Sequence, residues 1–248
     1  CGMKPRAALL FCILSLLTVG LFVLDMTVGA VRIPPGDIWA ALTGGDCPAA
    51  TAKIVLHIRL LKAVVALTAG AALAVSGLQM QTLFRNPLAG PYVLGISSGA
   101  SFGVALFMLG APLLGIAGSP GFTALGVAGA AWVGAAAILA VIAAVSRRIR
   151  DIMVILILGM MFGSGVSAVV QIMQYLSDEA ALKSFVIWTM GSLGDVTVPQ
   201  LAILLPSVIV GLLLAVWTIK PLNLLLFGEE YAVTMGLNIR RSRGLLFL

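Results

Sequence analysis

The fold of this chain is decided by the stretch Arg85-Asn-Pro-Leu-Ala-Gly-Pro-Tyr-Val-Leu-Gly-Ile-Ser-Ser-Gly-Ala100. It brings a charge, two prolines and a pair of serines into a sequence that is otherwise mostly apolar. Within a bilayer every backbone N–H and C=O group needs a partner inside the protein, so a polar segment broken by proline belongs at an interface or inside the protein. Because Asn, Pro and Gly favour turns, the stretch predicts a turn between two membrane-spanning helices, with Arg85 anchoring it on the cytoplasmic side.

The surrounding sequence has the composition of a membrane protein. Of its 248 residues 61% are hydrophobic and 10% are charged, and the mean hydropathy is +1.15. Soluble domains carry about 25% charged residues, so a water-soluble globular protein is excluded. The apolar stretches do not alternate with period two, which excludes a β-barrel as well. The composition therefore predicts an all-α polytopic membrane protein.

Six apolar segments approach or exceed the roughly 18–20 residues that are needed to cross a bilayer. They are residues 7–28, 63–83, 93–109, 123–145, 152–175 and 201–219. A seventh begins at Gly244 and reaches only Leu248, so we expect one transmembrane domain, residues 1–248, that is truncated at its C-terminus. The net charge is +6, and the basic residues responsible for it lie at the ends of the apolar segments. This position predicts contact with a lipid bilayer and not with nucleic acid.

The positions of Lys and Arg predict the orientation, because cytoplasmic loops carry an excess of basic residues. A cytoplasmic N-terminus places the basic cluster at residues 147–150 inside and the acidic loop at residues 178–194 outside. In this loop Asp178 can cap a short helix over residues 180–188, so we expect a short external helix there.

The sequence lacks the motifs of several kinds of nucleotide, metal and proton-transfer sites. It contains no G-x-x-x-x-G-K-[ST] phosphate loop, so no ATP site of that type is expected. His57 is its only histidine and its three cysteines are scattered, so no metal or haem site is predicted. No span carries a charge near its centre, which argues against a proton-driven carrier. We expect no catalytic residue and no bound cofactor.

Two polar clusters remain. In the first, at residues 222–238, Glu229 and Glu230 favour the first turn of a short helix through its dipole, and Gly236 permits the left-handed turn that ends it. The segment is either an ordinary surface helix or an element that a partner protein moves. In the second, Arg59 and Lys62 share one helix face on the outer side. They are either interfacial anchors or a docking site for acidic side chains.

The 85–100 stretch closely resembles the signature of the FecCD-type permeases, the membrane subunits of bacterial ABC importers for iron-siderophores, haem and cobalamin. The positions that carry the resemblance are Arg85, Asn86, Pro87, Leu88, Ala89, Pro91, Gly95, Ser98 and Gly99. It continues through residues 77–84, 188–193 and 228–230, and covers the chain from about Arg59 to its end.

This resemblance implies roles for both polar clusters. The order Glu230-Tyr-Ala232 and then Gly236 resembles the E-A-A-x-x-x-G motif that couples such permeases to their ATPases. The implied coupling residues are Gly228, Glu229, Glu230, Ala232 and Gly236. The family has an R-x-P-R pattern where this chain has Arg59-Leu-Leu-Lys62, which implies docking of a substrate-binding protein by Arg59 and Lys62. Lys62 keeps the charge of the family's arginine but loses its bidentate fork.

The resemblance also implies a fold and a function. The fold is a type II ABC importer transmembrane domain, with about ten helices in the complete permease. The chain would be a transport subunit without ATPase activity in the bacterial cytoplasmic (inner) membrane. Its implied partners are a second permease copy, an ABC ATPase that binds ATP and Mg, and a periplasmic or lipid-anchored binding protein. Substrate passes by alternating access, and nothing in the spans distinguishes siderophore, haem and cobalamin.

The resemblance places the substrate pathway along the fifth segment. The candidate pathway residues are Met160, Ser164, Ser167, Gln171 and Gln174. An alternative function is a secondary carrier or channel, in which residues 85–91 form a re-entrant loop. This alternative requires intramembrane charge or a complete inverted repeat, and the sequence shows neither.

Overall fold

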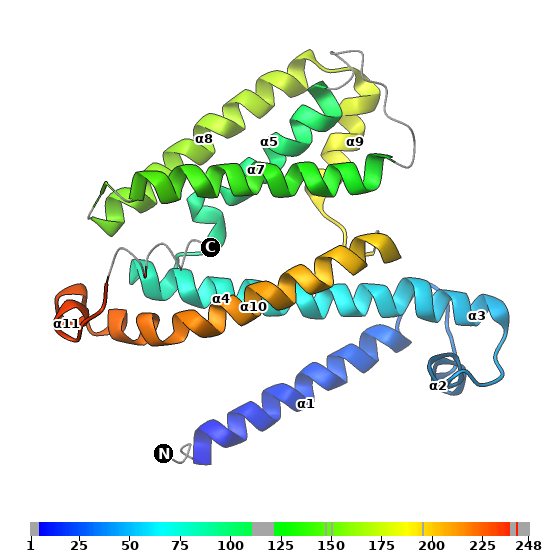
Figure 1. The fold of residues 1–248 in the computed structure, drawn as a ribbon. Coiled ribbons are helices and arrows are strands. Elements are labelled where there is room, and N and C mark those ends of the chain that lie inside the picture. The colour runs from blue at the N-terminus through cyan, green and yellow to red at the C-terminus, as the bar shows by residue number, and fades with distance from the viewer. Residues whose placement is uncertain are drawn as a thin grey trace. The chain divides into compact units, whose positions relative to one another are not determined.

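The computed structural model describes residues 5–110, 122–146, 148–149, 151–194, 196–238 and 242 (Figure 1). Every regular element among them is a helix, which confirms the all-α prediction. Within these described ranges, five helices are long and apolar enough to cross a membrane. They are α1 (Pro5–Thr27), α4 (Leu60–Phe84), α7 (Phe122–Ser146), α8 (Ile152–Leu176) and α10 (Val198–Leu226). The start of the expected seventh segment lies outside the described residues.

The third expected span differs from the prediction. Residues 93–109 are divided between a 3₁₀ turn η2 (Pro91–Leu94), the helix α5 (Ile96–Ala105) and a π-helical turn η3 (Leu106–Gly110). Ile96–Gly110 is therefore a shorter apolar helix than the five long ones. The cause is local, because Pro91 starts the tight turn and Gly95 leaves it in the left-handed conformation, at φ +73°.

The chain divides into two compact units, of which the first contains residues 1–70 and 192–202. Besides α1 and the start of α4 it holds α2 (Pro35–Thr43), α3 (Ala49–Ile54) and a π-helical turn η1 (Val55–Arg59). Its core is formed by Met26, Ile33, Ile38, Ala41, Val55 and Ala63. The helices α2 and α3 were not predicted, because they are too short to show as apolar segments in the sequence. One transmembrane domain over residues 1–248 stays a prediction.

The second unit contains residues 71–191 and 203–248, and α5 packs in it against both α7 and α8. Glycines bring these helices into backbone contact. A Cβ atom on Gly99 would lie 2.6 Å from the carbonyl oxygen of Gly134 in α7. One on Gly95 would lie 3.1 Å from the carbonyl oxygen of Gly159 and from the Cα of Gly163 in α8. Small residues allow such close approach of membrane helices, which accounts for Gly95 and Gly99 in the signature.

The other helices of this unit also make contacts through buried side chains. The amide of Gln79 in α4 donates to the hydroxyl of Thr218 in α10, at 2.8 Å, and Thr218 is buried. The predicted short helix is present as α9 (Glu179–Met190), where Phe185 is buried against Val104 and Val170. Asp178 occupies its N-cap position but makes no side-chain capping bond, so that part of the prediction is wrong.

Candidate coupling site

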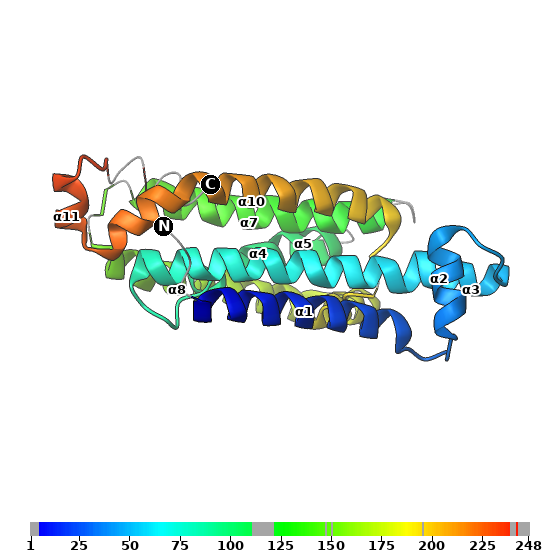
Figure 2. The same ribbon diagram turned by 90° about the horizontal axis from the view of Figure 1, so that it is seen from below.

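The short helix predicted after α10 is present as α11 (Glu229–Thr234) (Figure 2). Gly228 separates it from α10 with φ +117°, and Gly236 follows it with φ +85°. The N–H groups of Gly236 and Leu237 donate to the carbonyls of Val233 and Ala232, both at 2.9 Å. This is the Schellman arrangement that a left-handed glycine closes at a helix C-terminus. The left-handed turn predicted at Gly236 is confirmed.

One residue of α11 packs against the ends of α4 and α10. Ala232 is fully buried in a cluster that includes Leu83 and Phe84 of α4 and Leu225 of α10. The neighbouring positions Tyr231 and Val233 are exposed, so α11 presents an outer face to its surroundings. The side chains of Glu229 and Glu230 lie outside the part of the chain that the structure describes.

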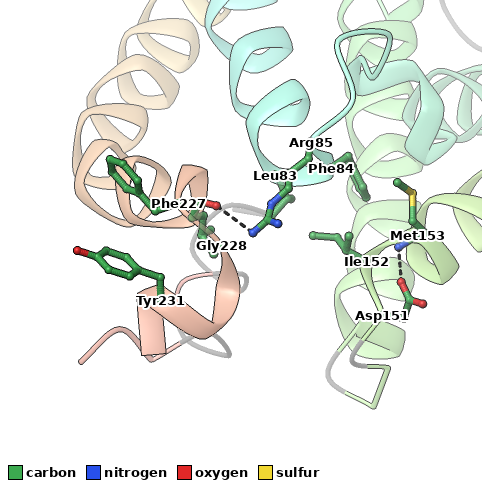
Figure 3. A pocket seen from close by; sticks show the side chains of 10 residues that line it. Leu83, Phe84, Arg85, Asp151, Ile152, Met153, Phe227, Gly228 and Tyr231 are labelled. Atoms are coloured by element: carbon green, nitrogen blue, oxygen red, sulfur yellow. Dashed lines mark hydrogen bonds between the residues drawn. The ribbon is translucent and has the colours of Figure 1, made fainter. Parts of the chain in front are cut away.

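A cleft of about 660 Å³ lies beside α11 (Figure 3). Its walls come from the end of α4, the start of α8, the end of α10 and the start of α11; they are formed by Leu83, Phe84, Arg85, Asp151, Ile152, Met153, Leu225, Phe227, Gly228 and Tyr231. Asp151 is the N-cap of α8, and its carboxylate accepts a hydrogen bond from the Met153 N–H at 2.8 Å. Arg85 lies on the opposite side, toward α10 and α11.

Arg85 has an unusual backbone. Its φ is +48°, and it is the only residue other than glycine with a positive φ in the described ranges. Its backbone N–H donates to the Thr82 carbonyl, and the N–H of Asn86 donates to the Gln81 carbonyl. Arg85 therefore occupies the position of the Schellman motif at the end of α4 that glycine usually takes. A side chain in this conformation costs about 1–2 kcal/mol. The guanidinium Nη2 donates to the Leu225 carbonyl of α10 at 3.2 Å.

The rest of the signature builds the turn after Arg85. The Asn86 side-chain oxygen accepts a hydrogen bond from the Leu88 N–H at 2.9 Å, and the Ala89 N–H donates to the Asn86 backbone carbonyl at 3.1 Å. Ala89 is buried, whereas the Leu88 side chain is 79% exposed. Residues 85–89 thus form an ordered turn, as the sequence predicted, and connect α4 to η2.

Comparison with known proteins agrees with this arrangement. The model of the FecCD transport family matches residues 16–248. The chain belongs to this family. A hemin transport system permease protein, HmuU of Yersinia pestis, is 35% identical over 99% of this chain and 71% of the relative. The vitamin B12 import system permease protein BtuC of Salmonella typhi is 35% identical over 95% of this chain and 67% of the relative.

The fold is similar to that of a solved structure. It is described as an inward-facing conformation of a metal-chelate type ABC transporter. The TM-score is 0.79 and the sequence identity is 27%, over 97% of this chain and 71% of that one. The chain is therefore a multi-pass permease with an ABC importer transmembrane fold.

The predicted docking residue Arg59 of this FecCD-family chain has an unexpected position. Its side chain is 6% exposed, and its guanidinium donates to the carbonyls of Met26 at 2.7 Å, Thr27 at 3.0 Å and Val31. These carbonyls lie at and beyond the C-terminal end of α1, where no helical partner is available for them. The geometry gives Arg59 a structural role at the end of α1. Docking of a partner by this residue stays a prediction.

Lys62 differs from Arg59 in its exposure. Its ammonium group lies 3.0 Å from the Asp25 carboxylate of α1, and its side chain is 45% exposed. A partner's acidic side chain can therefore reach Lys62 more readily than Arg59. Docking by Lys62 stays a prediction.

The five pathway candidates divide into two groups on α8. Met160, Ser164 and Gln171 are exposed, and the Ser164 hydroxyl donates to its own helix at the Met160 carbonyl. Ser167 instead donates to the Ser98 hydroxyl of α5 at 3.2 Å, so it belongs to the α5–α8 contact; Gln174 is half-buried. A pathway along α8 stays a prediction. No group of three metal-ligating side chains occurs among the described residues.

Proposed function

We propose that this chain is the permease subunit of an ATP-driven, binding-protein-dependent importer that works by alternating access. Its cargo is an iron complex, as ferric siderophore or haem, or cobalamin. The observation that carries the proposal is α11, a helix with a glycine of positive φ on each side and one residue buried in the core at the ends of α4 and α10. Such a helix can pass on a displacement applied to its exposed face, because Ala232 fastens it to the spans.

The proposed partners follow from this role. An ABC ATPase binds ATP and Mg and contacts the outer face of α11. A substrate-binding protein docks on the opposite side of the membrane, with Lys62 among its contacts. A second permease copy completes the assembly in the bacterial cytoplasmic membrane, and the N-terminus is cytoplasmic. Haem and cobalamin are candidate cargoes because relatives with 35% identity carry them in their names.

Transport by the full-length protein tests the proposal. The permease, its ATPase and its binding protein are reconstituted in liposomes, and uptake of haem, cobalamin and a ferric siderophore is measured in parallel. We expect uptake of one cargo only when ATP, Mg and the binding protein are all present. A proton gradient without ATP serves as the contrasting condition. Uptake driven by that gradient alone would support the secondary-carrier alternative instead.

A further inference from the structure

The side chain of Arg85 joins two segments that lie far apart in the sequence. Its Nη2 donates to the carbonyl of Leu225, in the last turn of α10, across 140 residues. The Leu225 carbonyl also accepts the N–H of Gly228 at 3.1 Å. A Cβ atom on Gly228 would lie 3.7 Å from the same Nη2. The guanidinium therefore lies against the junction at which α10 ends and α11 begins (Figure 3).

Charge and geometry favour this position of the guanidinium. The C-terminal end of a helix carries partial negative charge on its unpaired carbonyls, so a cation beside the end of α10 is stabilised. A hydrogen bond to one carbonyl is also directional, unlike the apolar contacts of Ala232 in the neighbouring cluster. The backbone of Arg85 keeps a conformation that favours glycine, although glycine has no side chain that could make this bond.

On its other side Arg85 starts the 85–89 turn, which leads into α5. Ala89 and Leu94 are buried in the cluster that also holds Ala232. Gly95 and Gly99 then set α5 against the backbones of α8 and α7. Close-packed backbone contacts of this kind deform little, so a displacement of the turn is passed on to α5.

We propose that Arg85 is a positioning residue of the transport cycle, which ties the α10–α11 junction to the 85–89 turn so that a displacement of α11 reaches α5. The inference rests on the proposed function, in which the partner ATPase displaces α11. It goes further by assigning to Arg85 the transmission of that displacement.

Two reporters in the full-length transporter test this link. A spin label is placed at Leu88 in the turn or at Val233 in α11, both of which are exposed, and the permease is assembled with its ATPase and binding protein in nanodiscs. With the native Arg85, ATP and vanadate should change the mobility of both labels. In Arg85→Met the label at Val233 should still respond, whereas the response at Leu88 should be lost. Uptake should fall about tenfold, which corresponds to the loss of one charge-assisted hydrogen bond.

Three further variants make the result specific. Arg85→Lys keeps the charge and a hydrogen-bond donor group and should restore part of the Leu88 response. Arg85→Asn tolerates a left-handed backbone but is too short to reach Leu225, and should behave like Arg85→Met. Arg148→Met removes an exposed arginine that does not line the cleft, and should leave both labels and uptake unchanged.

Each outcome has a definite meaning. A full Leu88 response in both Arg85→Met and Arg85→Asn overturns the link, whatever happens to uptake. If the label at Val233 does not respond even with the native Arg85, the proposed function of α11 fails. Co-purification of the ATPase with each variant checks that assembly is intact.

Discussion

At the scale of single residues, glycine contacts hold the centre of the second unit together. A Cβ atom on Gly99 would lie 2.6 Å from the Gly134 carbonyl, and that atom belongs to the backbone and cannot rotate away. The Gly95 and Gly99 positions of the signature are thus explained by space. No local sequence pattern explains these two glycines, because contacts between helices do not show in local patterns.

We expect Gly99→Ala to destabilise the permease by about 1–3 kcal/mol, because the added methyl group must separate α5 from α7. The measurement is the thermal unfolding midpoint of the detergent-purified full-length protein. Gly165→Ala in α8 is the matched control, since nothing lies within 4 Å of a Cβ atom there among the described residues. Equal midpoints for the two variants would contradict the packing described here.

Arg59 provides a second test at this scale. Replacement by Met removes three hydrogen bonds to carbonyls at the end of α1, and we expect a loss of about 2–4 kcal/mol because bonds to charged donors are strong and their loss leaves acceptors unpaired. Lys62→Met removes an exposed ion pair and should cost only about 0.2–1 kcal/mol. Chemical unfolding of both variants checks the difference.

The same pair of variants separates stability from docking. In a pull-down at low salt, Lys62→Met should weaken binding of the substrate-binding protein, and added salt should reduce the difference. If Arg59→Met weakened binding more strongly while leaving stability unchanged, Arg59 would dock the partner directly after all.

At the scale of elements, α11 carries the proposed coupling. Gly236→Ala forces a side chain into φ +85°, and Glu230→Ala removes a favourable charge from the first turn. We expect either change to lower the amount of substrate transported per ATP hydrolysed by about fivefold or more. A fivefold effect corresponds to the lower end of the usual range of coupling free energies. Parallel assays of uptake and ATPase rate check this, and Thr18→Ala, which is exposed on α1, is the control. Unchanged coupling in both variants would leave α11 as an ordinary surface helix.

Much of the element order was predictable from the sequence, because long apolar segments and left-handed glycines are local signals. Residues 152–175, for example, became α8 with a shift of one residue at its C-terminal end. Contacts between residues that lie far apart in the sequence could not be predicted. The three carbonyl acceptors of Arg59 lie about 30 positions earlier, and the bond of Arg85 to Leu225 spans 140 positions.

At the scale of the whole molecule, the orientation in the membrane is the property to test. Lys and Arg predict a cytoplasmic N-terminus, which puts Met190 outside and Leu88 inside. Both side chains are exposed, at 81% and 79%. In intact spheroplasts a membrane-impermeant thiol reagent should label Met190→Cys but not Leu88→Cys. Permeabilised cells serve as the control, where both should react, and the reverse pattern would invert the topology.

The left-handed backbone of Arg85 makes the loss of this side chain hard to detect by its effect on stability. Arg85→Gly should relieve about 1–2 kcal/mol of strain at the end of α4. The same change deletes the hydrogen bond to Leu225, which contributes a similar amount, so the unfolding midpoint should change little while uptake falls. A laboratory that selects heat-resistant variants of this permease for crystallisation should therefore measure uptake whenever position 85 has changed, because such a selection does not reject a glycine there.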